Sequence, residues 1–208
     1  MSRILIACEF SGVVRRAFTE RGYDAWSCDL LPAEDGSNRH IRCDVREILD
    51  DGWDLLIVAH PPCTRLCLSG VRWLHEAPRG RTIDDMWQEL DEAASLFGDL
   101  WNAPIPRRCI ENPVMHRHAR ERIRNYREPA QYIQPWQFGH GETKRTGLWL
   151  HNLPPLRPTR IVDGRTPRVH RLPPSPERWK ERSRTYPGVA AAMADQWGPL
   201  LMVEEAVA

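Results

Sequence analysis

The sequence contains no run of eighteen or more apolar residues, the length that a membrane-spanning helix requires. Its first residues, 1–7, enter an apolar segment directly and lack the layout of a signal peptide. Six cysteines are present, but no second Cys/His pair follows at the distance of a zinc ribbon. These absences predict a cytoplasmic protein without a structural zinc site. Most of its thiols are expected to be small buried side chains in a reducing compartment.

The net charge of the chain is only +1, but the charge is unevenly distributed. Residues 107–184 hold eighteen Lys/Arg against seven Asp/Glu, a net of +11, and the remainder carries a net of −10. Clustered positive charge suits a polyanion such as nucleic acid, because neutralised phosphates dominate that kind of affinity. The alternative is a solvated surface with internal ion pairs.

Short apolar runs alternate with segments of helical periodicity. The expected strands are 3–8, 24–29, 40–45, 53–59, 107–111, 131–135 and 146–150. The expected helices are 13–21, 84–101, 116–126 and 189–208, the last interrupted at residues 198 and 199. Core stripes are expected at Met86, Leu90, Ala94, Phe97 and Trp101, and at Val189, Met193 and Trp197. The alternation predicts an α/β fold, a mostly parallel, doubly wound sheet in a single domain, 1–208.

Polar groups follow five of the expected strands, and ligands of such sheets bind beyond the carboxyl ends of the strands. These groups are the turn 9–12, Asp29, Asp44, the segment 60–63 and the segment 111–113. Asp29 is placed to accept hydrogen bonds from ribose hydroxyls, and Asp44 from an adenine amino group. A turn or helix cap is the alternative role for either acid.

Cys63 follows two prolines directly after the clearest strand. The prolines fix the backbone and remove donors, so the thiol is set rigidly at the mouth of the sheet. A thiol there is well placed as a nucleophile. We expect His60, Arg65 and Arg72 to lower its pKa. The alternative is a structural cysteine in a tight loop.

Glu111 supplies the complementary group from a neighbouring strand end. Its carboxyl could bind the ring nitrogen and exocyclic amine of cytosine, and protonate N3 as sulfur adds to C6. That addition makes C5 nucleophilic enough to take a methyl group from a sulfonium. A turn at Asn112 and Pro113 is the alternative reading of this segment.

The order of five short motifs resembles that of the cytosine-C5 DNA methyltransferases. They are FSG at 10–12, an acid at Asp29, CDV at 43–45, PPC at 61–63 and ENP at 111–113. The resemblance covers roughly the first two thirds of the chain. It implies a Rossmann-like S-adenosylmethionine-dependent methyltransferase fold, with S-adenosyl-L-methionine as cofactor. The implied cofactor-binding residues are Glu9, Phe10, Ser11, Gly12, Asp29, Leu30, Asp44, Val45 and Pro62.

By the same resemblance Cys63 attacks C6 and Glu111 contacts N3. Lys144 or Arg145, with Arg145 preferred, takes the place of a basic residue in the family's Gln-x-Arg-x-Arg strand. The helix around 186–197 corresponds to the family's closing segment beside the cofactor.

Only about forty residues separate Gly147 from Pro187, too few for the large target-recognition domain usual in that family. The Pro- and Arg-rich segment 154–184 is expected to be irregular, with 154–176 lacking either periodicity. Its basic part, 157–184, either binds phosphates nonspecifically or is a disordered loop. The expected partner is nucleic acid, with DNA favoured and single-stranded DNA, RNA, a free cytosine nucleotide and a separate recognition protein left open.

Two other functions fit parts of the sequence. An amino (N4/N6) methyltransferase would use Asn112-Pro113 as its Asn-Pro-Pro-like motif, but Val114 stands where a base-stacking aromatic is expected. A non-catalytic nucleic-acid-binding module of the same fold would have no chemical need of Cys63 and Glu111. The transferred group is also open, because nothing in the sequence reads the substituent on the sulfonium.

Overall fold

Seven strands pair into one sheet across residues 2–202, the part of the chain that the computed structural model describes. Their order is β3-β2-β1-β4-β5-β7-β6. The strands are β1 (Arg3–Ala7), β2 (Asp24–Cys28), β3 (His40–Ile41), β4 (Leu55–Val58), β5 (Arg107–Pro113), β6 (Gln131–Ile133) and β7 (Thr146–His151). The first five run parallel, whereas β7 is antiparallel to β5 and β6. This is the doubly wound order with one antiparallel strand inserted between β5 and β6.

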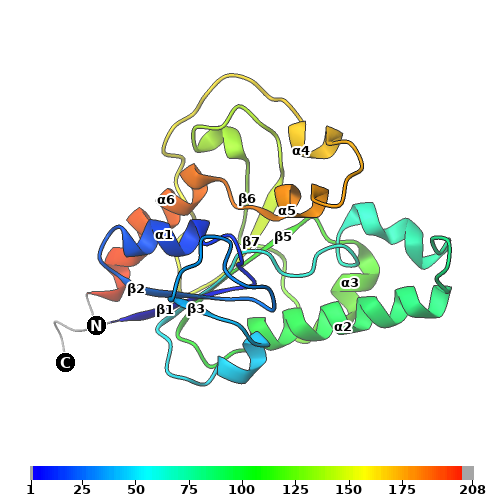
Figure 1. The fold of residues 1–208 in the computed structure, drawn as a ribbon, viewed down its shortest axis with the longest axis horizontal. Helices are drawn as coiled ribbons and strands as arrows, with labels where there is room; N and C mark the ends of the chain where they lie inside the picture. The colour runs from blue at the N-terminus through cyan, green and yellow to red at the C-terminus, as the bar shows by residue number, and fades with distance from the viewer. Residues whose placement is uncertain (1, 203–208) are drawn as a thin grey trace.

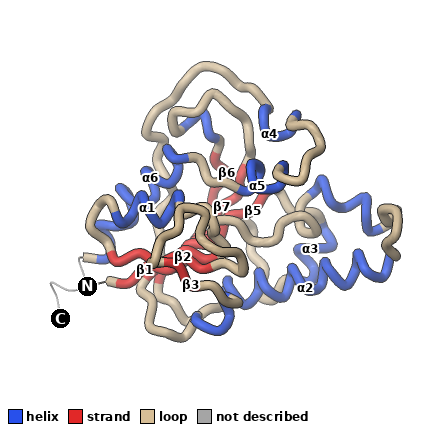
Figure 2. Tube along the Cα trace, viewed as in Figure 1, coloured by secondary structure: helices blue, strands red, loops and turns tan. Residues whose placement is uncertain are grey.

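Helices cover both faces of this sheet (Figures 1 and 2). The α-helices are α1 (Val13–Thr19), α2 (Ile83–Trp101), α3 (Arg117–Arg122), α4 (Arg168–Arg171), α5 (Arg178–Ser183) and α6 (Pro187–Trp197). Shorter 3-10 segments are η1 (Val45–Ile48), η2 (Leu68–Leu74), η3 (Pro135–Gln137) and η4 (Gly198–Leu201). Helices α1 and α6 pack together on one face, and α2 and α3 lie on the other (Figure 1).

Alternating strand residues supply a core on each face. Ile4 and Ile57 belong to the cluster under α1 and α6, whereas Leu5 and Leu56 belong to the cluster under α2. All four residues of β4 are buried, as expected for a central parallel strand. The two predicted core stripes are confirmed, since every member of both is buried.

The predicted strands all form, but some bounds differ. The third covers His40–Ile41 rather than 40–45, because the Asp44 carboxyl accepts the N–H of Arg46 and starts η1. The third predicted helix is shorter, ending before Ile123, whose ψ of 122° is extended. The closing helix begins at Pro187 and ends at Trp197, with η4 following; residues 203–208 of that prediction lie outside the described part.

The segment 154–184, called the arm below, is mainly loop, as predicted, but holds two short helices, α4 and α5 (Figure 2). The prediction of no helix within 154–176 is wrong for α4, a single turn too short to show a period. Arg178 donates a hydrogen bond to the His170 carbonyl at 3.4 Å, which joins the two helices. Within residues 2–202, no helix has the length and apolarity to cross a bilayer.

Candidate active site

A cavity of about 690 Å³ opens beyond the carboxyl ends of β1, β2, β4 and β5. Parallel strands that end at one edge bring their following loops together, so the location matches the expectation for such sheets. Two regions of its wall differ in chemistry. The acidic half is lined by Phe10, Asp29, Leu30, Asp44 and Val45. The thiol half is lined by His60, Cys63, Cys67, Glu111 and Lys144.

The acidic half gathers most of the residues predicted to hold a cofactor, and Pro62 lies on the same cavity wall. The Asp29 carboxyl accepts the N–H of Leu31 at 3.0 Å, and partial burial raises its pKa. Asp44 caps η1, and its pKa is lowered by hydrogen bonds from the Arg46 guanidinium. Leu30 is 68% exposed, so an apolar surface in this half has no partner within the described chain.

The turn 9–12 lies behind the wall of this half, since only Phe10 of its four residues lines the cavity. The buried Glu9 carboxyl accepts the N–H of Val14 at 2.6 Å and of Arg15 at 3.1 Å, at the start of α1. Burial raises the pKa of Glu9 to about 7 despite these bonds. Gly12 has φ 66°, a left-handed conformation that favours glycine. Cofactor contacts by Glu9, Ser11 and Gly12 stay predictions.

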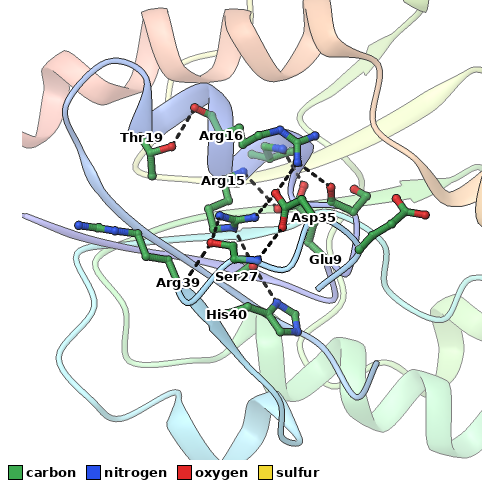
Figure 3. A network of polar contacts seen from close by, with 12 residues as sticks. Glu9, Arg15, Arg16, Thr19, Ser27, Asp35, Arg39 and His40 are labelled. Carbon is green, nitrogen blue, oxygen red and sulfur yellow. Dashed lines mark hydrogen bonds and ion pairs between the residues drawn. The ribbon is translucent and has the colours of Figure 1, made fainter. Parts of the chain in front are cut away.

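Arg15 holds this turn to the next loop and was not singled out from the sequence (Figure 3). Its side chain is 4% exposed and pairs with Asp35 at 2.6 Å. It also donates to the hydroxyls of Ser27 at 3.1 Å and Ser37 at 2.5 Å. The Ser27 hydroxyl in turn contacts His40 Nδ1 at 2.8 Å (Figure 3). One buried guanidinium therefore connects α1, β2 and the β2–β3 loop.

The loop that carries Cys63 is pinned to the segment after β5. Leu68 N–H donates to the Val114 carbonyl at 3.0 Å, and His116 N–H donates to the Leu66 carbonyl at 3.1 Å. A Cβ at Gly70 would lie 1.8 Å from the carbonyl oxygen of Thr64, so this close approach requires glycine. The strand ends that bear Cys63 and Glu111 are thus fixed relative to each other.

Cys63 and Cys67 form a pair across one turn, since Cys67 N–H donates to the Cys63 carbonyl at 3.0 Å. The interaction between their thiols lowers the pKa of Cys67 to about 6. The same interaction and burial raise the pKa of Cys63, and the nearby Glu111 adds to the effect. The Ser69 hydroxyl also contacts the Cys67 sulfur at 3.1 Å.

The expectation that three basic groups lower the pKa of Cys63 is wrong. Burial lowers the pKa of His60 to about 3, so its ring is neutral. Arg65 pairs with Glu89 at 2.6 Å, and Arg72 stacks over the ring of Trp73 at 4.1 Å. None of the three places a positive charge beside the sulfur.

Glu111 faces the same part of the cavity as Cys63, as predicted. Burial raises the pKa of its carboxyl, against the opposing effect of Lys144. Its oxygens lie 4.0 Å from His60 Nδ1 and 4.0 Å from Lys144 Nζ. Among residues 2–202, neither ring nitrogen of His60 has a hydrogen-bond partner, although the side chain is only 4% exposed. A carboxyl that keeps its proton can donate to a ring nitrogen.

Of the two basic candidates at the start of β7, Lys144 is the one beside Glu111. Arg145 also lines the cavity, but its guanidinium lies over the ring of Tyr132 at 4.1 Å. A catalytic role for Arg145 stays a prediction. The Cys63-to-Cys67 spacing, one helical turn, was the available signal for the second thiol, whereas no local pattern indicated that Trp179 lines the cavity.

Two solved structures resemble this chain. One is a protein provisionally assigned as a DNA modification methyltransferase encoded within a prophage of E. coli, with a TM-score of 0.50, 12% identity, and coverage of 78% of this chain and 52% of the other. The second is the Entamoeba histolytica methyltransferase EhMeth, with a TM-score of 0.50, 13% identity, and coverage of 78% and 58%. The chain has a methyltransferase fold.

This finding confirms the predicted Rossmann-like fold of S-adenosylmethionine-dependent methyltransferases. The matched region spans about half the length of the two relatives. No family model and no curated protein matches the sequence. At such identities the likeness concerns the fold alone, so the chemistry must be argued from the cavity.

Proposed function

We propose that the protein is an S-adenosylmethionine-dependent methyltransferase that modifies C5 of cytosine through a covalent bond between Cys63 and C6. The observation that carries the proposal is one cavity lined by both Cys63 and Glu111, which come from separate strand ends. The resemblance of the PPC and ENP segments to cytosine-C5 enzymes supports it independently.

The acidic half fits the adenosine part of the cofactor. A carboxyl at Asp29 suits ribose hydroxyls, and Asp44 lies near enough in the same wall to reach an adenine amino group. The unpartnered Leu30 side chain, with Val45, offers apolar surface to a purine ring. S-adenosylmethionine bound there would supply an electrophilic methyl group.

In the thiol half, sulfur of Cys63 bonds to C6 of the ring after losing its proton to water. Glu111, kept protonated by burial, donates to N3 and offsets the charge that builds on the ring. Electron density then rises at C5, which would take the methyl group as its bond to the sulfonium sulfur breaks, leaving S-adenosylhomocysteine. Loss of the C5 proton to water restores the double bond between C5 and C6 and expels the Cys63 thiolate.

Nucleic acid is the proposed source of the cytosine. The excess of positive charge in residues 107–184 supports a polyanionic substrate, and one structural relative is described as a DNA modification enzyme. We propose a single domain, 1–208, in which the arm takes the position in sequence of a larger recognition domain.

The geometry argues against the amino methyltransferase. That chemistry would need the Asn112 side chain in the cavity, but its amide donates to the carbonyl of Pro113 at 2.9 Å. Asn112 is fully buried and is absent from the cavity wall. Its role here is to stabilise the turn after β5.

Oligonucleotides that contain 5-fluorocytosine test the covalent step, because fluorine at C5 cannot leave as a proton does. We expect a protein–nucleic-acid adduct that survives denaturation, requires S-adenosylmethionine and maps to Cys63 by peptide mass spectrometry. Cys63→Ala should form none while still binding the cofactor. An adduct retained in Cys63→Ala, or full turnover by that variant, would exclude this mechanism.

A further inference from the structure

The arm forms part of the cavity wall. Its contributions to the lining are Val169, His170, Trp179, Arg182 and Ser183. They face the same cavity as Lys144, beside Glu111. In Figure 1, α4 and α5 lie at the end of the molecule where β5, β6 and β7 are labelled. The substrate would therefore enter between the strand-end loops and the arm.

Contacts near the middle and at the C-terminal end of the arm hold it in this position. The ring of Trp179 lies 5.5 Å from that of Phe10, in the acidic half. Arg184 binds both oxygens of Glu34, at 2.5 and 2.6 Å. Near the middle, Arg168 pairs with Glu142 at 2.9 Å. A segment secured by a bidentate ion pair and a ring contact presents its remaining side chains in defined places.

The arm's other ion pairs leave Arg182 available. Glu34 is taken by Arg184, Glu142 by Arg168, and Glu177 by Lys180 at 2.6 Å. Within residues 2–202, the side chain of Arg182 makes no hydrogen bond or ion pair, and it lines the cavity in an exposed position. Burial raises the pKa of the nearby Glu111, which reduces the negative charge that it places beside Lys144.

Arg182 and Lys144, which line the same cavity as His170, are both close enough to affect its ring. Burial lowers the pKa of His170, and the positive charges of Arg182 and Lys144 lower it further. Three basic groups from three segments thus line one cavity, and of these Arg182 has no ion pair within residues 2–202, whereas Lys144 has Glu111 at 4.0 Å. A phosphate matches such a site, since a guanidinium can donate two parallel hydrogen bonds to its oxygens.

We propose that Arg182, His170 and Lys144 bind a phosphate of the nucleotide that carries the target cytosine. The inference rests on the proposed function for the identity of the base. It names the substrate class as an unpaired strand or a cytosine nucleotide. Holding the nucleotide by the arm avoids the cost of flipping a base out of a duplex.

The test measures binding separately from chemistry, with full-length Cys63→Ala protein saturated with S-adenosylhomocysteine. A labelled single-stranded oligonucleotide with one cytosine is titrated by fluorescence anisotropy over a salt series. Deoxycytidine monophosphate and deoxycytidine are titrated by calorimetry. Arg182→Gln is compared with Arg171→Gln, which removes the same charge from an exposed arm residue outside the cavity wall.

We expect Arg182→Gln to weaken oligonucleotide binding by about tenfold and to reduce the salt slope by about one. Arg171→Gln should change the affinity less than about twofold. If the monophosphate loses its advantage over deoxycytidine in Arg182→Gln, the site holds the phosphate of the target nucleotide itself. If only the oligonucleotide is affected, the site holds a flanking phosphate of the strand, and the assignment to the target nucleotide is wrong.

Equal effects of the two variants, or none from Arg182→Gln, would overturn the proposal. The two proposals fail differently. Tight, Arg182-dependent binding without methyl transfer by the native protein would refute the proposed reaction and leave the phosphate site standing. Methyl transfer that is unchanged by Arg182→Gln would support the proposed reaction and refute the phosphate site.

Discussion

The two halves of the cavity are built in opposite ways. In the acidic half, a buried guanidinium, Arg15, pairs with Asp35, Ser27 and Ser37 behind the wall, although the buried Ser11 hydroxyl has no partner within residues 2–202. The wall of this half carries carboxylates and apolar surface. In the thiol half, His60 is buried with neither ring nitrogen paired within the same residues, and the Glu111 carboxyl, 13% exposed, has Lys144 Nζ at 4.0 Å. Unpaired buried polar groups cost stability, so they are expected where a ligand supplies the partners.

This contrast assigns binding to one half and reaction to the other. A half whose polar groups are mostly paired presents a fixed surface. A half with unsatisfied groups gains its hydrogen bonds only when substrate enters, which favours interactions made in the reacting complex. Substitutions in each half should therefore affect different measurements.

The largest expected effect is on the rate in the thiol half. Glu111→Gln keeps the shape of the side chain but removes the proton that the carboxyl gives to N3. We expect methyl transfer to slow by about a thousandfold, measured with labelled S-adenosylmethionine. Cofactor affinity should stay within about twofold. A loss below about tenfold would contradict the role of Glu111.

The acidic half is tested by Arg15→Gln, which leaves Asp35, Ser27 and Ser37 without their shared donor. We expect the free energy of unfolding to fall by about 2 kcal/mol, less than for a fully buried pair because Asp35 is partly exposed. Affinity for S-adenosylhomocysteine should also fall.

Arg16→Gln is the matched control for that experiment. Arg16 is 43% exposed and pairs with the same Asp35 oxygen at 2.5 Å. We expect it to change stability by less than about 0.5 kcal/mol. Equal losses in the two variants, measured by urea unfolding, would show that burial of Arg15 does not organise the turn.

The strand ends could be predicted from sequence because each apolar run ends at a polar residue, and parallel topology brings those ends to one edge. The placement of Cys63 and Glu111 at that edge could be predicted from this rule alone. The inward turn of Glu9 and the burial of Arg15 could not be predicted, since charged residues in a strand-to-helix turn normally indicate exposure. The position of the arm depends on pairs such as Arg184 with Glu34, far apart in the chain, which leave no local pattern.

The halves also differ in the pH dependence of stability. The pKa of His60 is about 3 in the folded protein, below its ordinary 6.5, so only the unfolded chain takes up a proton as pH falls below 6.5. Its contribution is fully present above pH 6.5 and is lost toward pH 3. Glu9 acts in the opposite sense, because its raised pKa of about 7 makes the folded state bind a proton first between pH 7 and 4.5.

His60→Phe isolates the first contribution. We expect the stability difference between native protein and variant to be constant above pH 6.5. Below it, the native protein should lose up to about 1.4 kcal/mol per pH unit relative to the variant. Urea unfolding at pH 7.5, 6.5 and 5.5 measures this, and a difference that stays constant across all three would contradict a neutral buried His60.

The smallest expected effect concerns the thiol pair. The interaction between the Cys67 and Cys63 thiols favours ionisation of Cys67 and raises the pKa of Cys63. Cys67→Ser removes the competing thiolate, so the midpoint for Cys63 alkylation should move to lower pH. At pH 7.5 its reaction with iodoacetamide should quicken by up to about tenfold, the factor that one pKa unit allows.

Peptide mass spectrometry assigns the alkylated residue in that experiment, and the fully buried Cys109 in the same digest serves as an internal control that should not react. Slower alkylation of Cys63 in Cys67→Ser would contradict the competition between the two thiols. It would mean that Cys67 promotes ionisation of its neighbour, as a base would, rather than competing with it for the negative charge.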